Sequence, residues 1–167
     1  MLWGGRLGDP NSGGGSGDGS TINYTVNCRN ILYDVIKKYS IKSLLDIPCG
    51  SLAWMPLLLN NITNEIPDFR YYGVDVVESV INISKVKYAN KKNWKLDVLD
   101  ITSQELPDGY DLLFSRDAFQ HLPLIKIANA LKMIANAKEA KYFLVGSYVK
   151  TGVNVNINIG GYKIIFI

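Results

Sequence analysis

The chain has 167 residues, 47% of them hydrophobic and 20% charged, which indicates one globular domain large enough to bury a core. The net charge of +3 is spread along the sequence, and no stretch approaches the roughly 18 apolar residues that a membrane helix needs. With no secretory signal at the N-terminus either, we expect a cytoplasmic protein that binds neither membranes nor nucleic acid.

Residues 1–20 are rich in Gly, Ser, Asp and Asn, a composition typical of a flexible linker. From Thr21 to Tyr39, apolar residues recur at helical spacing and two lysines occupy the last turn, which predicts a helix that packs on a sheet. We therefore divide the chain into a Gly/Ser-rich segment, residues 1–20, and a single domain, residues 21–167.

A short apolar run, Ser43–Ser51, contains an acidic residue, Asp46, and ends in a tight turn. Such a run predicts a buried strand. The next stretch, Leu52–Leu59, predicts a short buried helix with Pro56 in its first turn, because proline is tolerated there. We expect a loop over residues 60–68, so the chain here runs strand, turn, helix and loop.

Four further stretches predict strands, at Arg70–Asp75, Trp94–Leu99, Tyr110–Ser115 and Tyr142–Ser147. Helices are predicted between them, over Val77–Tyr88 and from Pro123 onward. In the second of these helices we expect the core-facing residues to be Ile125, Ile127, Ala128, Leu131, Ile134 and Ala135. Strands that alternate with helices imply a parallel sheet, so the fold class is α/β.

The tail has a different pattern. From Val153 to Ile159, apolar residues alternate with asparagines, and Gly160-Gly161 leads into a second apolar run that ends at Ile167. Strict alternation followed by a two-residue glycine loop predicts an antiparallel hairpin. We expect this hairpin to close one edge of the sheet.

Acidic residues follow three successive predicted strands, at Asp46, Asp75 and Asp100. The carboxyl ends of parallel strands meet at one edge of the sheet, where ligands bind because backbone N–H groups and helix N-termini converge there. Taken singly, Asp46 is equally consistent with a helix cap and Asp75 with a solvated loop. Their joint placement favours a site for a ligand that carries hydroxyl groups and a positive charge.

Arg116 and Asp117 directly follow the fourth strand run, and His121, the one histidine of the chain, comes four residues later. His121 is either a general base or a helix-start histidine that bonds to a carbonyl. Arg116 either pairs with Asp117 or binds an anionic acceptor. Cys28 and Cys49 have neither metal nor redox spacing, so we expect two reduced thiols that pack as small apolar groups.

Several motifs together resemble class I S-adenosylmethionine-dependent methyltransferases, and more narrowly a group of small members with an Asp-x-Pro-Cys-Gly first motif. They are Asp46-x-Pro48-Cys49-Gly50, Gly73-Val74-Asp75, Asp100, and Arg116-Asp117 followed by His121-Leu122. Trp3-Gly4-Gly5 and the run 12–16 are similar to the start of that group's sequences. The resemblance implies a Rossmann-like methyltransferase fold, with a mostly parallel sheet in the order 3-2-1-4-5 and helices on both faces.

The same resemblance implies S-adenosylmethionine as cofactor and no metal. It assigns cofactor binding to Asp46, Pro48, Cys49, Gly50, Trp54, Asp75, Val76, Asp100, Ile101 and Ser115, and catalysis to His121, Asp117 and Arg116. In this assignment Asp46 and the turn after it approach the methionine part, while Asp75 accepts from the ribose hydroxyls. Asp100 and the backbone at Ile101 read the adenine amine, and Trp54 is a neighbour of the sulfonium.

The expected reaction is methyl transfer to an O or N nucleophile of a small molecule or glycan. Two alternatives stay open. Ser51 stands where the narrower group has an acid, and the tail is short, which favours a catalytically inactive, truncated methyltransferase-like protein. An NAD-dependent oxidoreductase is the other alternative, but such enzymes need several glycines around the pyrophosphate, and the turn here has Gly50 alone.

Overall fold

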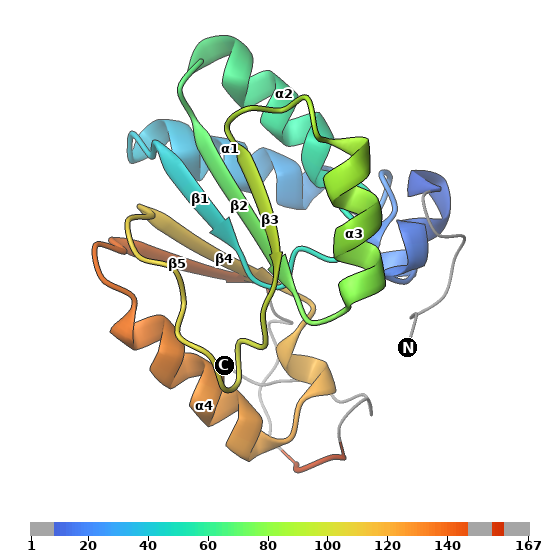
Figure 1. The fold of residues 1–167 in the computed structure, drawn as a ribbon, viewed down its shortest axis with the longest axis vertical. Helices are drawn as coiled ribbons and strands as arrows, with labels where there is room; N and C mark the ends of the chain where they lie inside the picture. Colours follow the sequence, from blue (N-terminus) through green and yellow to red (C-terminus); the bar gives the residue numbers. More distant parts are fainter. Residues whose placement is uncertain (1–8, 147–154, 159–167) are drawn as a thin grey trace.

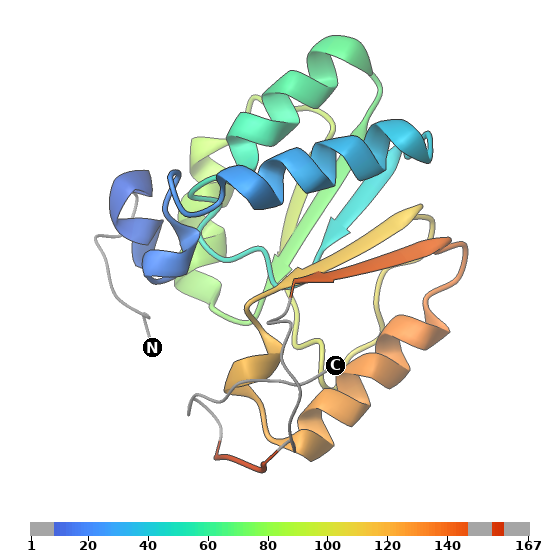
Figure 2. The ribbon, with the colours of Figure 1, turned by 180° about the vertical axis from the view of Figure 1, so that it is seen from behind.

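The computed structural model describes residues 9–146 and 155–158 (Figures 1 and 2). Its centre is a five-stranded sheet with the strand order β3-β2-β1-β4-β5, and all neighbouring strands are parallel. The strands are β1 (Ser43–Asp46), β2 (Arg70–Asp75), β3 (Trp94–Val98), β4 (Leu112–Arg116) and β5 (Tyr142–Gly146). The predicted strands, the α/β class and the order 3-2-1-4-5 are therefore confirmed.

Four α-helices and three short 3-10 helices accompany the sheet in the described part of the chain. The α-helices are α1 (Val26–Lys38), α2 (Met55–Glu65), α3 (Glu78–Lys87) and α4 (Leu124–Asn136). The 3-10 helices are η1 (Pro10–Gly15), η2 (Asp18–Ser20) and η3 (Phe119–His121). Pro56 lies in the first turn of α2, as predicted.

The helices cover both faces of the sheet, because successive strand residues point to opposite sides. On β1, Leu44 packs with side chains from α1, α2 and α3, whereas Leu45 belongs to a second cluster that contains Ala130 and Ile134 of α4. Figure 1 shows α4 on the opposite side of the sheet from α1 and α2. Each buried strand is thus apolar on both faces, which explains the continuous apolar runs in the sequence.

The loop predicted over residues 60–68 is wrong at its beginning, because α2 continues to Glu65. Ile62 is fully buried in the core beside α1, and the hydroxyl of Thr63 donates to the carbonyl of Leu59. The buried isoleucine stabilises a longer helix than the Asn-rich sequence suggests, since tertiary packing outweighs weak helix propensity.

The core-facing side of α4 is also predicted incorrectly. Ile125 is 67% exposed, and Ala128, Leu131 and Ala135 are exposed as well. Ile134 is buried and Ile127 packs partly against the same cluster, as predicted, but the other buried residue is Ala130. Apolar residues surround most of this helix, so periodicity alone does not identify the face that meets the sheet.

The hairpin predicted over residues 153–167 lies outside the described residues, except for residues 155–158, which are not in a strand. Within these four, the side-chain oxygen of Asn156 accepts a hydrogen bond of 2.9 Å from the backbone N–H of Leu124, at the start of α4. In the described ranges, none of the helices has the length and apolar character needed to cross a bilayer.

Candidate functional site

Asp46 ends β1 with its carboxyl group almost fully buried, at 3% exposure. The hydroxyl of Tyr71 donates a hydrogen bond of 2.8 Å to Oδ2 of this carboxyl group. Burial raises the pKa of Asp46 to about 8; the hydrogen bond from Tyr71 and the charge of Arg116 oppose the shift, while the charge of Asp75 adds to it. Near neutral pH, Asp46 is therefore largely protonated in this structure.

Gly73 makes the contact between Tyr71 and Asp46 possible. In the register of β1 and β2, Tyr71 lies opposite Leu44 and Gly73 lies opposite Asp46, so Tyr71 and Gly73 share one face of the sheet. A Cβ atom at Gly73 would lie 2.8 Å from the hydroxyl oxygen of Tyr71 and 2.9 Å from Cβ of Cys49. The missing side chain leaves the space through which the tyrosine reaches the next strand.

Asp75 ends β2 and is tied to the turn after β1. The backbone N–H of Gly50 donates to Oδ2 and that of Val77 donates to Oδ1, both at 2.9 Å. Burial raises the pKa of Asp75, which is 7% exposed, although the bonds from Val77 and Gly50 act in the opposite direction. With the backbone of Val76 also bonded to this carboxyl group, at least one of its four lone pairs stays available for a ligand hydroxyl.

Asp100, two residues beyond β3, caps the turn that follows it. Its Oδ1 accepts from the N–H and the hydroxyl of Thr102 at 2.8 and 2.7 Å, and its Oδ2 accepts from the hydroxyl of Ser103 at 2.9 Å. Burial alone would raise the pKa of Asp100, but these hydrogen bonds outweigh it and hold the pKa below its usual value. Ile101, next in the chain, is buried against the α4 side of the sheet.

The structure brings Asp46 and Asp75 close enough for their charges to interact, with Asp100 after the next strand. The N–H of Leu99 donates to the carbonyl of Asp75 at 3.0 Å, so the ends of β2 and β3 meet. The other predicted cofactor residues lie in different surroundings. Trp54 is buried in the core with its ring edge-on to Phe114, whereas Val76 is exposed.

The predicted turn residues Pro48, Cys49 and Gly50 are each half-buried. Cys49 donates its N–H to the carbonyl of Val74 at 2.8 Å, and burial raises the pKa of its thiol well above the usual value. Cys49 and Cys28 are free thiols that pack partly against the core on the α1 side. Both cysteines therefore serve as small apolar groups, and the Cys49 N–H fixes the turn to β2.

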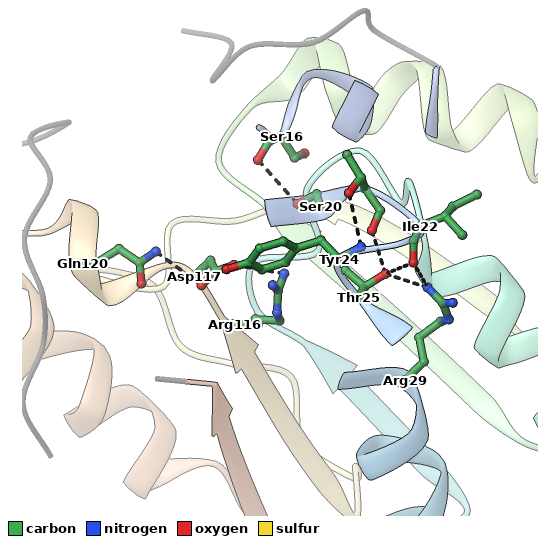
Figure 3. A network of polar contacts seen from close by, with 10 residues as sticks. Ser16, Ser20, Ile22, Tyr24, Thr25, Arg29, Arg116, Asp117 and Gln120 are labelled. Atoms are coloured by element: carbon green, nitrogen blue, oxygen red, sulfur yellow. Dashed lines mark hydrogen bonds and ion pairs between the residues drawn. The ribbon is translucent and has the colours of Figure 1, made fainter. Parts of the chain in front are cut away.

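A polar cluster stands at the carboxyl end of β4 (Figure 3). Arg116, with its side chain 12% exposed, pairs with Oδ2 of Asp117 at 2.9 Å, and Gln120 donates to Oδ1 of Asp117 at 3.3 Å. The guanidinium also lies 5.8 Å from the centre of the Tyr24 ring. Of the two interpretations of Arg116, the structure shows the pair with Asp117.

An unpartnered hydroxyl and a small cavity lie beside this cluster. The buried hydroxyl of Ser115 has no hydrogen-bond partner among the described residues, which is costly unless another polar group meets it. A cavity of about 10 Å³, room for roughly one water molecule, lies next to it. Its lining residues are Ser115, Asp117, Ala118, Phe119, Gln120, Val145 and Gly146. His121 follows Gln120 at the end of η3.

Three site residues escaped the sequence reasoning: Ser16, Tyr24 and Tyr71. Ser16 lies on the turn after β1, where its hydroxyl oxygen accepts from the N–H of Ser51 at 2.9 Å and donates to the Ser51 hydroxyl at 3.1 Å. Tyr71 and Gly73 are two residues apart in a predicted strand, so the sequence indicates that they lie on the same face of the sheet. The contacts of Ser16 and Tyr24 join distant parts of the chain and had no local signal.

The comparisons with known proteins identify the family and the fold. Residues 45–140, more than half of the chain, match the family described as "Methyltransferase domain". The chain belongs to this methyltransferase family, as the resemblance implied. No curated protein sequence matches the chain.

Solved structures of methyltransferases share the fold. The methyltransferase domain of bacterial CtHen1 is 20% identical with a TM-score of 0.61, over 73% of this chain and 65% of that one. An O-methyltransferase of a polyketide synthase multienzyme from Brevibacillus brevis, in complex with S-adenosyl-L-homocysteine, is 17% identical with a TM-score of 0.56. A coclaurine N-methyltransferase bound to N-methylheliamine and S-adenosylhomocysteine is 20% identical with a TM-score of 0.53.

These last two matches cover 70% of this chain in each case, and 38% and 35% of the larger proteins. The chain therefore spans less than two thirds of the length of each of these three structures. At such identities the likeness concerns the fold.

Proposed function

We propose that the chain is an S-adenosylmethionine-dependent methyltransferase that acts on an O or N nucleophile of a small molecule or glycan. The observation that carries this proposal is that Asp46 and Asp75 lie close together at the carboxyl edge of the sheet, beside the Gly50 turn. Family membership supports the reaction class, and two of the methyltransferases that share the fold have S-adenosylhomocysteine bound.

The residues of this edge suit such a cofactor chemically. S-adenosylmethionine supplies a methyl group on a positively charged sulfur. Asp75 keeps at least one lone pair for the ribose hydroxyls, and Oδ2 of Asp100 retains one for the adenine amine. A positive charge near Asp46 favours its ionised form, so ligand and carboxylate stabilise each other. The unpartnered hydroxyl of Ser115 offers a further polar contact.

Methyl transfer needs the nucleophile to be held in line with the methyl group, so positioning contributes most of the rate. A hydroxyl or a protonated amine also needs a base, and we assign this role to His121 at the end of η3. Asp117 and Gln120, which line the cavity, would orient the acceptor, while Arg116 holds Asp117 in place.

An inactive methyltransferase-like protein is the second candidate, and the contacts of Ser51 favour it. Ser51 bonds to Ser16 and to the carbonyl of Gly13 rather than presenting an acid to the site. Measuring cofactor binding separates the two candidates.

The test is calorimetry with S-adenosylhomocysteine. We expect the wild-type chain to bind it and Asp75→Asn to bind at least about tenfold more weakly, because the amide loses the charge and one acceptor. Asp97→Asn is the control, since Asp97 is partly exposed and pairs with Lys85. No binding by the wild-type chain favours the inactive candidate, equal affinity of Asp75→Asn refutes the site, and tighter binding of NADH favours the oxidoreductase.

A further inference from the structure

The Gly/Ser-rich segment is anchored on the turn after β1, although the two are 35 residues apart. Gly14 is buried at a φ of +60°, and a Cβ atom there would lie 2.6 Å from the Ser51 hydroxyl oxygen. Gly50 has a φ of +57°, and a Cβ atom on it would lie 2.7 Å from the Ser16 hydroxyl oxygen. Two glycine turns are thus fitted against each other, and side chains on either would separate them.

A second anchor lies at the end of β4, as Figure 3 shows. The ring of Tyr24 faces the Arg116 guanidinium, and a Cβ atom on Gly19 would lie 3.2 Å from Oδ2 of Asp117. The segment then joins α1 firmly, because Arg29 donates to the carbonyl of Ile22 at 2.7 Å. Residues 13–24 are therefore fixed on the β1 side and on the β4 side.

These two anchors belong to the elements that carry the site. The first is the turn whose Gly50 N–H holds Asp75, and the second is the ion pair next to Ser115. Figure 2 shows η1 and η2 at the end of the sheet toward which the strands point. Ordering a glycine-rich chain is entropically costly, so contacts must offset it, and here they are made with the elements of the site.

We propose that residues 13–24 form the outer wall of the cofactor site and cover the bound ligand. This inference rests on the proposed function. Ser16 holds the wall to the β1 turn, and Tyr24 holds it to Arg116. By excluding water above Asp46 and Asp75, the wall strengthens their polar contacts with the bound ligand and slows its dissociation.

The experiment measures binding of S-adenosylhomocysteine by calorimetry and its dissociation rate by stopped flow, on the full chain. Gly14→Val forces the two turns apart, and Tyr24→Ala removes the second anchor without touching the core, since Tyr24 is 60% exposed. Gly109→Val is the matched control, because Gly109 also has a positive φ, +84°, but lies in the turn before β4, near Glu139. Thermal unfolding confirms that each variant folds.

We expect Gly14→Val and Tyr24→Ala to bind about tenfold more weakly, with faster dissociation, and Gly109→Val to stay within about twofold of wild type. Unchanged affinity in both wall variants overturns the inference, and so does tighter binding, which would mean that the segment competes with the ligand. In both of these outcomes the wild-type chain still binds S-adenosylhomocysteine, so the proposed function stands. A wild-type chain that does not bind overturns the proposed function and the wall together.

Discussion

The hydroxyl of Tyr71 donates to the buried carboxyl group of Asp46 across the space that Gly73 leaves open. The two side chains come from neighbouring parallel strands, and both are almost completely buried. A neutral donor stabilises a buried carboxylate much less than a paired cation does, so burial dominates and the carboxyl group keeps its proton. The end of β1 therefore holds a proton that a cationic ligand can displace.

This proton makes the stability of the fold depend on pH. The pKa of Asp46 is about 8 in the folded chain, against about 3.9 for an unfolded aspartic acid. The folded state thus binds the proton more tightly, and stability that is fully present below about pH 4 is lost as the pH rises toward 8.

We expect Asp46→Asn, which resembles the protonated acid but does not titrate, to remove this dependence. Between pH 5 and 8, the free energy of unfolding of wild type should fall relative to Asp46→Asn by as much as about 1.4 kcal/mol per pH unit. Urea unfolding at four pH values measures the difference. A difference that stays constant with pH contradicts the raised pKa.

Removing the Tyr71 hydroxyl should destabilise the fold more than the same change at Tyr72. Tyr71→Phe leaves Oδ2 of Asp46 buried without its donor, which costs about 1–3 kcal/mol. Tyr72 donates to Asp97 at 2.7 Å, but Asp97 is partly exposed and keeps its ion pair with Lys85. We expect Tyr72→Phe to cost less than about 1 kcal/mol. Equal losses in urea unfolding would argue against the special role of the Asp46 contact.

Gly73→Ala tests the space between these strands. The added methyl group would meet the Tyr71 hydroxyl, Cys49 and Leu96 at 2.8–2.9 Å, and such overpacking costs about 1–3 kcal/mol. In the double variant with Tyr71→Phe, part of the clash disappears. The loss of unfolding free energy in the double variant should therefore be smaller than the sum of the losses in the two single variants. Strict additivity in the double-mutant cycle would mean that the methyl group does not contact Tyr71.

The outcome of the sequence reasoning depends on how local each signal is. Most strands were predictable because they are short apolar runs, although β3 carries Lys95 and Asp97, and the order 3-2-1-4-5 followed from the family resemblance. The buried face of α4 was not, because Ile125 and Ile134 are equally apolar and tertiary packing alone selects one of them. The hydrogen bond between Ser16 and Ser51 joins residues that are 35 positions apart, and no local sequence pattern predicts it.

The same distinction applies to the carboxylates. That Asp46, Asp75 and Asp100 follow successive strands could be predicted from the positions at which the apolar runs end. Their hydrogen-bond partners could not, since the Gly50 N–H reaches Asp75 only after the turn has folded back on β2. Likewise, the partner of Asp46 depends on strand register and on the small size of Gly73. The sequence therefore identifies the carboxyl groups, but their protonation depends on partners that only the folded structure shows.

If the proposed cofactor site is correct, Asp46 should also distinguish two ligands that differ in charge. S-adenosylmethionine carries a sulfonium, whereas S-adenosylhomocysteine has a neutral sulfur. The sulfonium favours ionised Asp46, so below pH 8 its binding releases a proton, and its affinity relative to the neutral ligand rises as the pH approaches the pKa of about 8.

Calorimetry in two buffers of different ionisation enthalpy counts the released protons, and titrations at pH 6, 7 and 8 give the affinity ratio. The ratio should rise with pH for wild type and stay flat for Asp46→Asn, which cannot ionise. An equal rise in the variant would assign the titration to another group, such as Asp75, whose pKa burial also raises. A flat ratio in wild type would place the sulfonium away from the end of β1, because a charge beside Asp46 must shift its protonation.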